Sequence, residues 1–262
     1  MNYLIKLSSI SILIALTGCE DNDNPSTIYP EQLIFQNIDI TVTNNSINAT
    51  SAYFSNDVIY FSSLDEKQLL SINRNQQFSL NIKRSQASEY SPIDYTTYIS
   101  EEQLSSSLQA GDELTVIFNR STGSVLESSA QVPRFARFLA PFTEQVIDHS
   151  TTDLSIEWDL AASESSKLYL RGECLSQPFT VGNNEFSVLP YDLTEGQTSL
   201  LIPMNTIDKA YGFDSENCSV SAHLYQQNTG IIDPNFAGGR YNIKSDSSIS
   251  FTLTNLKDTN ND

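Results

Sequence analysis

The chain has 262 residues, with 32 Asp and Glu against 14 Lys and Arg, and a formal net charge of −18. Hydrophobic residues make up 39% of it, which is enough for a packed core. The acidity excludes nucleic acid as a partner, and also an anionic membrane bound through a basic patch, because both need clustered Lys and Arg.

The first 18 residues are expected to be an export signal. Lys6 precedes an apolar stretch, Leu7 to Ala15, that is too short to span a bilayer as a helix. The sequence Leu16-Thr17-Gly18-Cys19 that follows resembles the lipobox of bacterial lipoproteins. The resemblance implies cleavage before Cys19 and acyl chains on that residue, which would attach the protein to a membrane. The alternative is an ordinary signal peptide.

The lipobox implies a place in the bacterial cell envelope. Glu20 stands where an Asp retains many enteric lipoproteins at the inner membrane, so the outer membrane is favoured and either leaflet stays open. Residues 19–30 are polar and acidic, and we interpret them as a tether. Residues 21–25 resemble the calcium-binding linker of cadherins, but over five residues only, so we predict no metal and no cofactor.

Residues 31–132 are expected to form a first β-sandwich. Apolar and polar residues alternate in three short runs, Ile38–Val42, Phe78–Ile82 and Leu114–Phe118. Alternation places the apolar side chains on one face of each strand, and that face needs an opposing sheet to cover it. One segment, Ser100–Gln109, breaks the pattern and favours a short helix.

Three tyrosines of this first half, Tyr90, Tyr95 and Tyr98, lie in one segment. Exposed aromatic rings stack on sugar faces or anchor a protein partner, so these residues are a candidate binding surface. The alternative is that some of the rings belong to the core. The sequence leaves both interpretations open.

A boundary between two domains is expected near Val132 and Pro133. Phe135, Phe138 and Phe142 follow it within ten residues. So many apolar residues are unusual for a free linker, which is commonly polar and exposed. We therefore expect the two domains to touch there.

Residues 133–256 repeat the alternation, and residues 257–262 are expected to be a disordered tail. The alternating runs are Leu154–Trp158, Lys167–Cys174, Cys218–Tyr225 and Ile249–Leu253. A strand ending in Trp, a turn and a strand ending in Gly-Glu-Cys resembles the B and C strands of a fibronectin type III domain. The prediction is an all-β protein of two tandem immunoglobulin- or fibronectin type III-like β-sandwiches.

Cys174 and Cys218 both occupy apolar positions of their runs, and the fibronectin type III resemblance makes those strands sheet neighbours. In an exported protein we expect a structural disulfide between them. It would close a loop of roughly 45 residues and contribute about 4 kcal/mol. A metal pair is the alternative, but zinc takes four ligands and no His–Cys spacing here supplies the others.

No set of residues in the sequence predicts catalysis. His149 lies between Asp148 and Ser150 in one loop, whereas the members of a catalytic triad converge from separate parts of a fold. His223 shares the outward positions of its strand, which is typical of a surface residue. Adjacent acids such as Glu101-Glu102 suit glycoside hydrolysis by type only, because neighbouring side chains diverge.

The connection from 228 to 242 is longer than two late strands need. Its glycines, Phe236 and Arg240 suit a recognition loop. They suit equally a loop that folds back over the end of the sandwich.

The whole chain resembles uncharacterised bacterial lipoproteins that carry immunoglobulin- or fibronectin type III-like domains behind a lipobox. This resemblance implies location and architecture, not chemistry. We expect a non-enzymatic, lipid-anchored protein that binds or scaffolds another envelope component, either protein or glycan. The alternatives are a glycan-binding module that uses the three tyrosines, and a hydrolase that uses two carboxylates.

Overall fold

The computed structural model describes residues 30–55, 58–59, 67–83, 94–120, 122–163, 165–174, 185–204, 206–207 and 217–256. These residues form β-strands and two short 3-10 helices, η2 (Glu31–Leu33) and η3 (Glu101–Gln103), so the all-β class is confirmed. Among them, no helix has the length and apolar character needed to cross a bilayer. The signal peptide, Cys19, Tyr90 and the tail lie outside the described residues.

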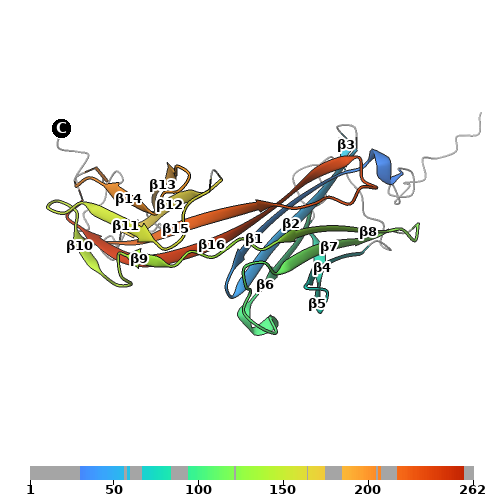
Figure 1. The fold of residues 1–262 in the computed structure, drawn as a ribbon, viewed down its shortest axis with the longest axis horizontal. Coiled ribbons are helices and arrows are strands. Elements are labelled where there is room, and N and C mark those ends of the chain that lie inside the picture. Colours follow the sequence, from blue (N-terminus) through green and yellow to red (C-terminus); the bar gives the residue numbers. More distant parts are fainter. Residues whose placement is uncertain are drawn as a thin grey trace, which may run out of the picture.

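Figure 1 shows an elongated molecule with two lobes that share two long strands. The strands of the first lobe are β1 (Phe35–Thr43), β2 (Ser46–Ser55), β3 (Val58–Ile59), β4 (Lys67–Ile72), β5 (Gln76–Lys83), β6 (Asp94–Ile99), β7 (Glu113–Asn119) and β8 (Val125–Gln131). They follow the hydrogen-bonded order β1-β2-β6-β5-β4-β7-β8, with β3 beside β2. This sheet curves so that β8 comes back towards the two long strands. An isolated bridge joins Ser129 of β8 to Ile231, which lies in the connection between those long strands.

The second lobe consists of two sheets. Its strands are β9 (Phe138–Ala140), β10 (Val146–Asp148), β11 (Leu154–Trp158), β12 (Lys167–Cys174), β13 (Glu185–Asp192), β14 (Ser199–Ile202), β15 (Asn217–Thr229) and β16 (Gly238–Thr254). One sheet has the order β14-β11-β9. The other has the order β13-β12-β15-β16, with β10 beside β16.

The long strand β16 belongs to both lobes. Its first half pairs in parallel with β1, from Phe35 opposite Gly238 to Val42 opposite Ser245. Its second half pairs with β10, while β15 runs antiparallel beside it from Asn242 to Thr254. One sheet therefore continues from the first lobe into the second.

Two clusters of buried side chains divide near the expected boundary at Val132 and Pro133. The first cluster draws on β1, β2 and β4 to β8, but it also contains Phe236, Tyr241 and Ile243 from the C-terminal part of the chain. The second cluster begins at Ala136. Residues 31–132 therefore complete their core only with residues from the C-terminal part of the chain.

The inward faces predicted from alternation are confirmed in most strands. The buried residues include Ile38, Ile40 and Val42 in β1, Leu114, Val116 and Phe118 in β7, Leu154, Ile156 and Trp158 in β11, and Val220, Ala222 and Leu224 in β15. Each set lies at alternate positions, as a pleated strand requires.

The helix expected over Ser100–Gln109 is wrong beyond its first turn. Only Glu101–Gln103 is helical, with a capping box between Ser100 and Gln103. The following backbone makes its hydrogen bonds with other parts of the first lobe: the Leu108 N–H donates to the Asn44 carbonyl at 2.9 Å. These outside partners replace the bonds of a second helical turn.

The connection between the lobes is bound to β16. The Ser245 hydroxyl donates to the Arg134 carbonyl at 2.9 Å, and the Ala136 N–H donates to the Ser247 hydroxyl at 3.0 Å. Phe135 packs against the first core and Phe138 against the second, whereas Phe142 is exposed. The connection thus contacts both cores through Phe135 and Phe138, while Phe142 contacts neither.

Candidate functional site

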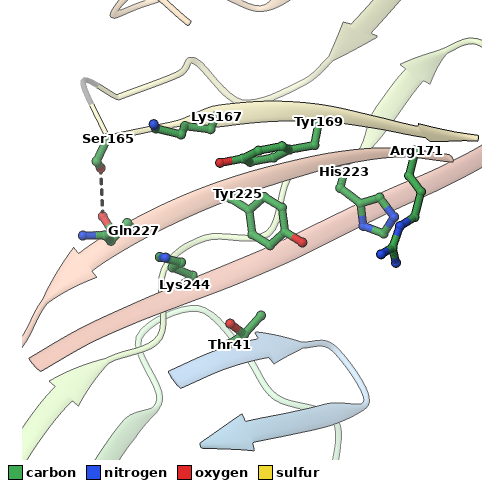
Figure 2. A pocket seen from close by; sticks show the side chains of 9 residues that line it. All are labelled: Thr41, Ser165, Lys167, Tyr169, Arg171, His223, Tyr225, Gln227 and Lys244. Atoms are coloured by element: carbon green, nitrogen blue, oxygen red, sulfur yellow. Dashed lines mark hydrogen bonds between the residues drawn. The ribbon is translucent and has the colours of Figure 1, made fainter. Parts of the chain in front are cut away.

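An open groove of about 630 Å³ lies on the outer face of the sheet, where β12, β15 and β16 pass the end of β1. Figure 2 shows its lining side chains: Thr41, Ser165, Lys167, Tyr169, Arg171, His223, Tyr225, Gln227 and Lys244. On β12 and β15 these residues alternate with buried Leu168, Leu170 and Leu224. Strand pleating therefore directs them away from the core and into the groove.

The register of the sheet arranges the lining in rows across the strands. Lys167 is opposite Tyr225, and Tyr169 is opposite His223. Lys244 is opposite Gln227 on one side and Thr41 on the other. Residues from four strands, far apart in the sequence, therefore meet in one surface.

The groove concentrates positive charge in an acidic protein. Lys167, Arg171 and Lys244 are three of the chain's 14 Lys and Arg. The Lys167 ammonium lies 3.6 Å from Asp192, and both side chains are exposed. An exposed pair of this kind is weak, so the Lys167 charge is still open to a ligand.

Two tyrosines form an aromatic pair within the groove. The ring centroids of Tyr169 and Tyr225 are 5.4 Å apart, with an angle of 82° between the ring planes. The imidazole of His223 lies nearly parallel to the Tyr225 ring, at 6.3 Å between centroids. Figure 2 shows the Tyr225 ring face-on and Tyr169 edge-on.

A chain of hydrogen bonds fixes this aromatic set. His223 Nδ1 lies 3.1 and 3.2 Å from the two Asp246 carboxylate oxygens, and Nε2 lies 3.1 Å from the Ser221 hydroxyl. Burial, together with the charge of Asp246 and a hydrogen bond to it, raises the pKa of Tyr225 to about 12. The phenol is therefore protonated at neutral pH, and its hydrogen bond with Asp246 holds the Tyr225 ring.

Ser221, His223 and Asp246 are linked by hydrogen bonds in the same order as the residues of a hydrolytic triad. The surroundings of Ser221, however, differ from those of a catalytic nucleophile. Ser221 lies inside β15, which is paired with β12 on one side and β16 on the other. The sheet therefore uses the backbone N–H groups that would have to stabilise an oxyanion. The Ser221 hydroxyl also lies 3.4 Å from the Arg171 carbonyl, which is an alternative hydrogen-bond acceptor. We interpret the three residues as support for the groove.

The expected surface of three tyrosines is wrong for Tyr95. This ring is 1% exposed and packs edge-on against Tyr53, at 5.9 Å between centroids. Tyr98 is 66% exposed. Residues three apart on a strand point to opposite faces, so Tyr95 and Tyr98 cannot form one platform. Tyr90 lies outside the described residues.

The connection from 228 to 242 folds back over the first lobe, so Phe236 is a core residue and not part of a binding surface. Phe236 packs against Tyr53 and Phe118. Asp233 accepts a hydrogen bond from the Glu127 N–H at 2.8 Å. Arg240 is exposed, and its guanidinium lies 3.4 Å from Asp39.

The other candidate residues lie apart from the groove. His149 is fully buried, its Nε2 accepts from the Ile207 N–H at 3.3 Å, and burial lowers its pKa. Cys174 of β12 lies directly opposite Cys218 of β15 in the strand register. Over the described ranges, no three His, Cys, Asp or Glu residues gather into a metal-binding group.

The comparisons add a distant structural likeness. No family model and no curated protein matches this chain. Its structure is similar to that of dimeric latent PorU from Porphyromonas gingivalis, with a TM-score of 0.26 and 13% sequence identity. The match covers 82% of this chain and 19% of that one.

Proposed function

We propose that this protein is a lipid-anchored, non-enzymatic binding protein of the bacterial cell envelope, with the outer membrane favoured, and that the groove is its binding surface. One observation carries the proposal. Three cations and two oriented tyrosines gather on a rigid sheet in a chain whose net charge is −18. Binding sites place a few oriented polar groups and aromatic rings in a concave surface of this kind.

The position of η2, near the first described residue, supports an anchor remote from the groove. Figure 1 places η2 at the end of the first lobe that is far from the second lobe. Arg120, 1% exposed in its side chain, holds Glu31 of this helix at 2.9 Å. From Cys19 to Pro30 an extended tether spans at most about 40 Å. A membrane anchor on Cys19 would leave the groove and the second lobe facing outward.

We also propose a fibronectin type III-like second half with a Cys174–Cys218 disulfide. The orders β14-β11-β9 and β13-β12-β15-β16 match a sandwich whose sheets contain strands E, B, A and C′, C, F, G. Directly opposite residues in an antiparallel pair have Cα atoms about 4.5 to 5.5 Å apart. That spacing lies within the range of disulfides.

Crosslinking in living cells tests the binding role of the groove. A photo-reactive amino acid replaces Lys167, at the groove, or Arg137, whose exposed side chain lies elsewhere. We expect one envelope component to be attached from position 167 and absent from position 137. No adduct at 167, or the same adducts from both positions, would contradict the proposal.

Membrane fractionation of the Cys19→Ala variant tests the anchor separately. We expect the variant to leave the detergent-soluble membrane fraction, because its acyl chains are lost. A variant that stays there as the unaltered protein does would overturn the lipoprotein assignment and leave the groove proposal standing.

A further inference from the structure

We infer that the groove takes an acidic saccharide, a glycan chain whose sugars carry carboxylate or sulfate groups. This inference rests on the proposed function and names the chemical class of its ligand.

Every residue of the lining carries a polar group, and this favours a ligand rich in hydroxyl groups. Each of the nine lining side chains carries an oxygen or nitrogen atom, and none is aliphatic. A lipid tail would leave those groups without hydrogen bonds, at a large cost in free energy. Sugar hydroxyls both donate and accept, so they match Thr41, Ser165 and Gln227.

The tyrosine pair supplies the apolar part of sugar recognition. A sugar ring presents C–H groups on its faces and hydroxyls at its edges, so it stacks on an aromatic face that has polar neighbours. Tyr225 is held by its hydrogen bond with Asp246 and by its contact with the nearly parallel His223 ring. A ring that is fixed before binding loses little conformational entropy when the ligand arrives.

The spacing of the cations fits a chain better than a single small anion. Lys167 and Arg171 are four residues apart on β12, which corresponds to roughly 13 Å along the strand. Lys244 lies two strands away, beside Thr41. A guanidinium binds carboxylate or sulfate oxygens in pairs, whereas an ammonium acts as a point charge. Successive acidic sugars can reach these cations together.

The size of the groove separates a saccharide from a protein partner. Ligand pockets enclose about 300 to 1,000 Å³, and the groove has about 630 Å³. A stable protein interface covers about 800 Å² of each partner, more than a groove lined by nine residues supplies. The acidic protein as a whole repels polyanions, so recognition here depends on contacts within the groove.

Affinity electrophoresis of the purified chain tests this inference. The gels contain polygalacturonate, dextran sulfate, neutral dextran or polyglutamate. We expect retardation by polygalacturonate, by dextran sulfate or by both. Retardation by the first alone indicates that the groove binds carboxylate groups, and retardation by the second alone indicates that it binds sulfate groups. We expect no retardation by dextran and much weaker retardation by polyglutamate, which has the charge without the sugar.

Matched variants locate the binding. The double variant Arg171→Ala/Lys244→Ala is expected to bind about tenfold more weakly or worse, because charge-assisted contacts are lost. Tyr169→Ala should weaken binding. Tyr225→Phe should weaken it less, since the phenylalanine retains the ring and loses only the hydrogen bond to Asp246. Arg240→Ala, which removes an exposed cation outside the groove, should bind as the unaltered chain does.

Three results of the binding assays would overturn the inference. The first is no retardation by either acidic polysaccharide, and the second is equal retardation by polyglutamate. The third is binding that the groove variants leave unchanged. The proposed function fails separately, when position 167 captures nothing in cells. A protein captured there would keep the binding role and remove the saccharide.

Discussion

The connection 228–242 and the groove contain the same kinds of residues and do different things. Each has an aromatic ring and an arginine beside turns or polar side chains, Phe236 with Arg240 and Tyr225 with Arg171. Phe236 is 6% exposed and fills the first core, whereas Tyr225 lines an open surface. The difference lies in what covers them: β8 and β1 receive the connection, and nothing in the described part of the chain covers the outer face of β12 and β15.

Breaking the close backbone contact at the end of this connection should destabilise the protein most. Gly239 has a φ of +139°, and a Cβ there would overlap the Gln36 carbonyl oxygen. Gly239→Ala should lower the free energy of unfolding by about 4 kcal/mol or more, because backbone must move. Urea unfolding followed by tyrosine fluorescence measures it.

Gly123 is the matched control for this substitution. It has a φ of +89°, but nothing lies within 4 Å of a Cβ placed there. Gly123→Ala should cost only the left-handed backbone penalty, about 1 kcal/mol. Equal losses at the two positions would show that the approach of β16 to β1 is not tight.

The proposed disulfide predicts a nearly equal effect in the second lobe. Cys174→Ser/Cys218→Ser should lower the free energy of unfolding by about 4 kcal/mol. Intact mass before and after reduction, which differs by two hydrogens for a disulfide, checks the bond itself. Finding two free thiols in protein isolated from the envelope would contradict it.

The sequence could predict local features of both lobes. Alternation identified the buried faces of strands such as β1 and β11, and the resemblance placed Cys174 beside Cys218. Alternation also placed Tyr169 and Arg171 on the outward face. Their meeting with Lys244 and Thr41 depends on the pairing of β15 with β16 and of β16 with β1, which no local pattern encodes. The burial of Phe236 depends equally on a partner more than a hundred residues away.

Replacing one aromatic residue in the connection and one in the groove compares their roles in stability and in ligand binding. Phe236→Ala should cost about 3 kcal/mol, because it leaves a cavity beside Tyr53 and Phe118. Tyr169→Ala should cost less in stability and more in ligand binding, because it removes groove surface. Thermal unfolding and the polysaccharide gels, run on both variants, give the two effects. If Phe236→Ala stays folded but binds the polysaccharide poorly, the connection 228–242 takes part in binding after all.

A smaller change is expected in the pH dependence of the free energy of unfolding. It comes from His149, which is buried in the second lobe. Burial lowers the pKa of this imidazole, so the folded protein holds it neutral. In the unfolded chain it gains a proton as the pH falls through about 6.5. The unfolded state then binds more protons, and the free energy of unfolding falls as the pH decreases below that value.

The variant His149→Gln keeps an acceptor for the Ile207 N–H and removes the titrating ring. Its free energy of unfolding should therefore change less between pH 7 and pH 5 than that of the unaltered protein, although it is lower at pH 7 because the core packs less well. Urea titrations of both chains at several pH values measure the two slopes. Because the carboxylates are the same in both chains, parallel slopes would mean that His149 is protonated in the folded protein, in conflict with its burial beside Ile207.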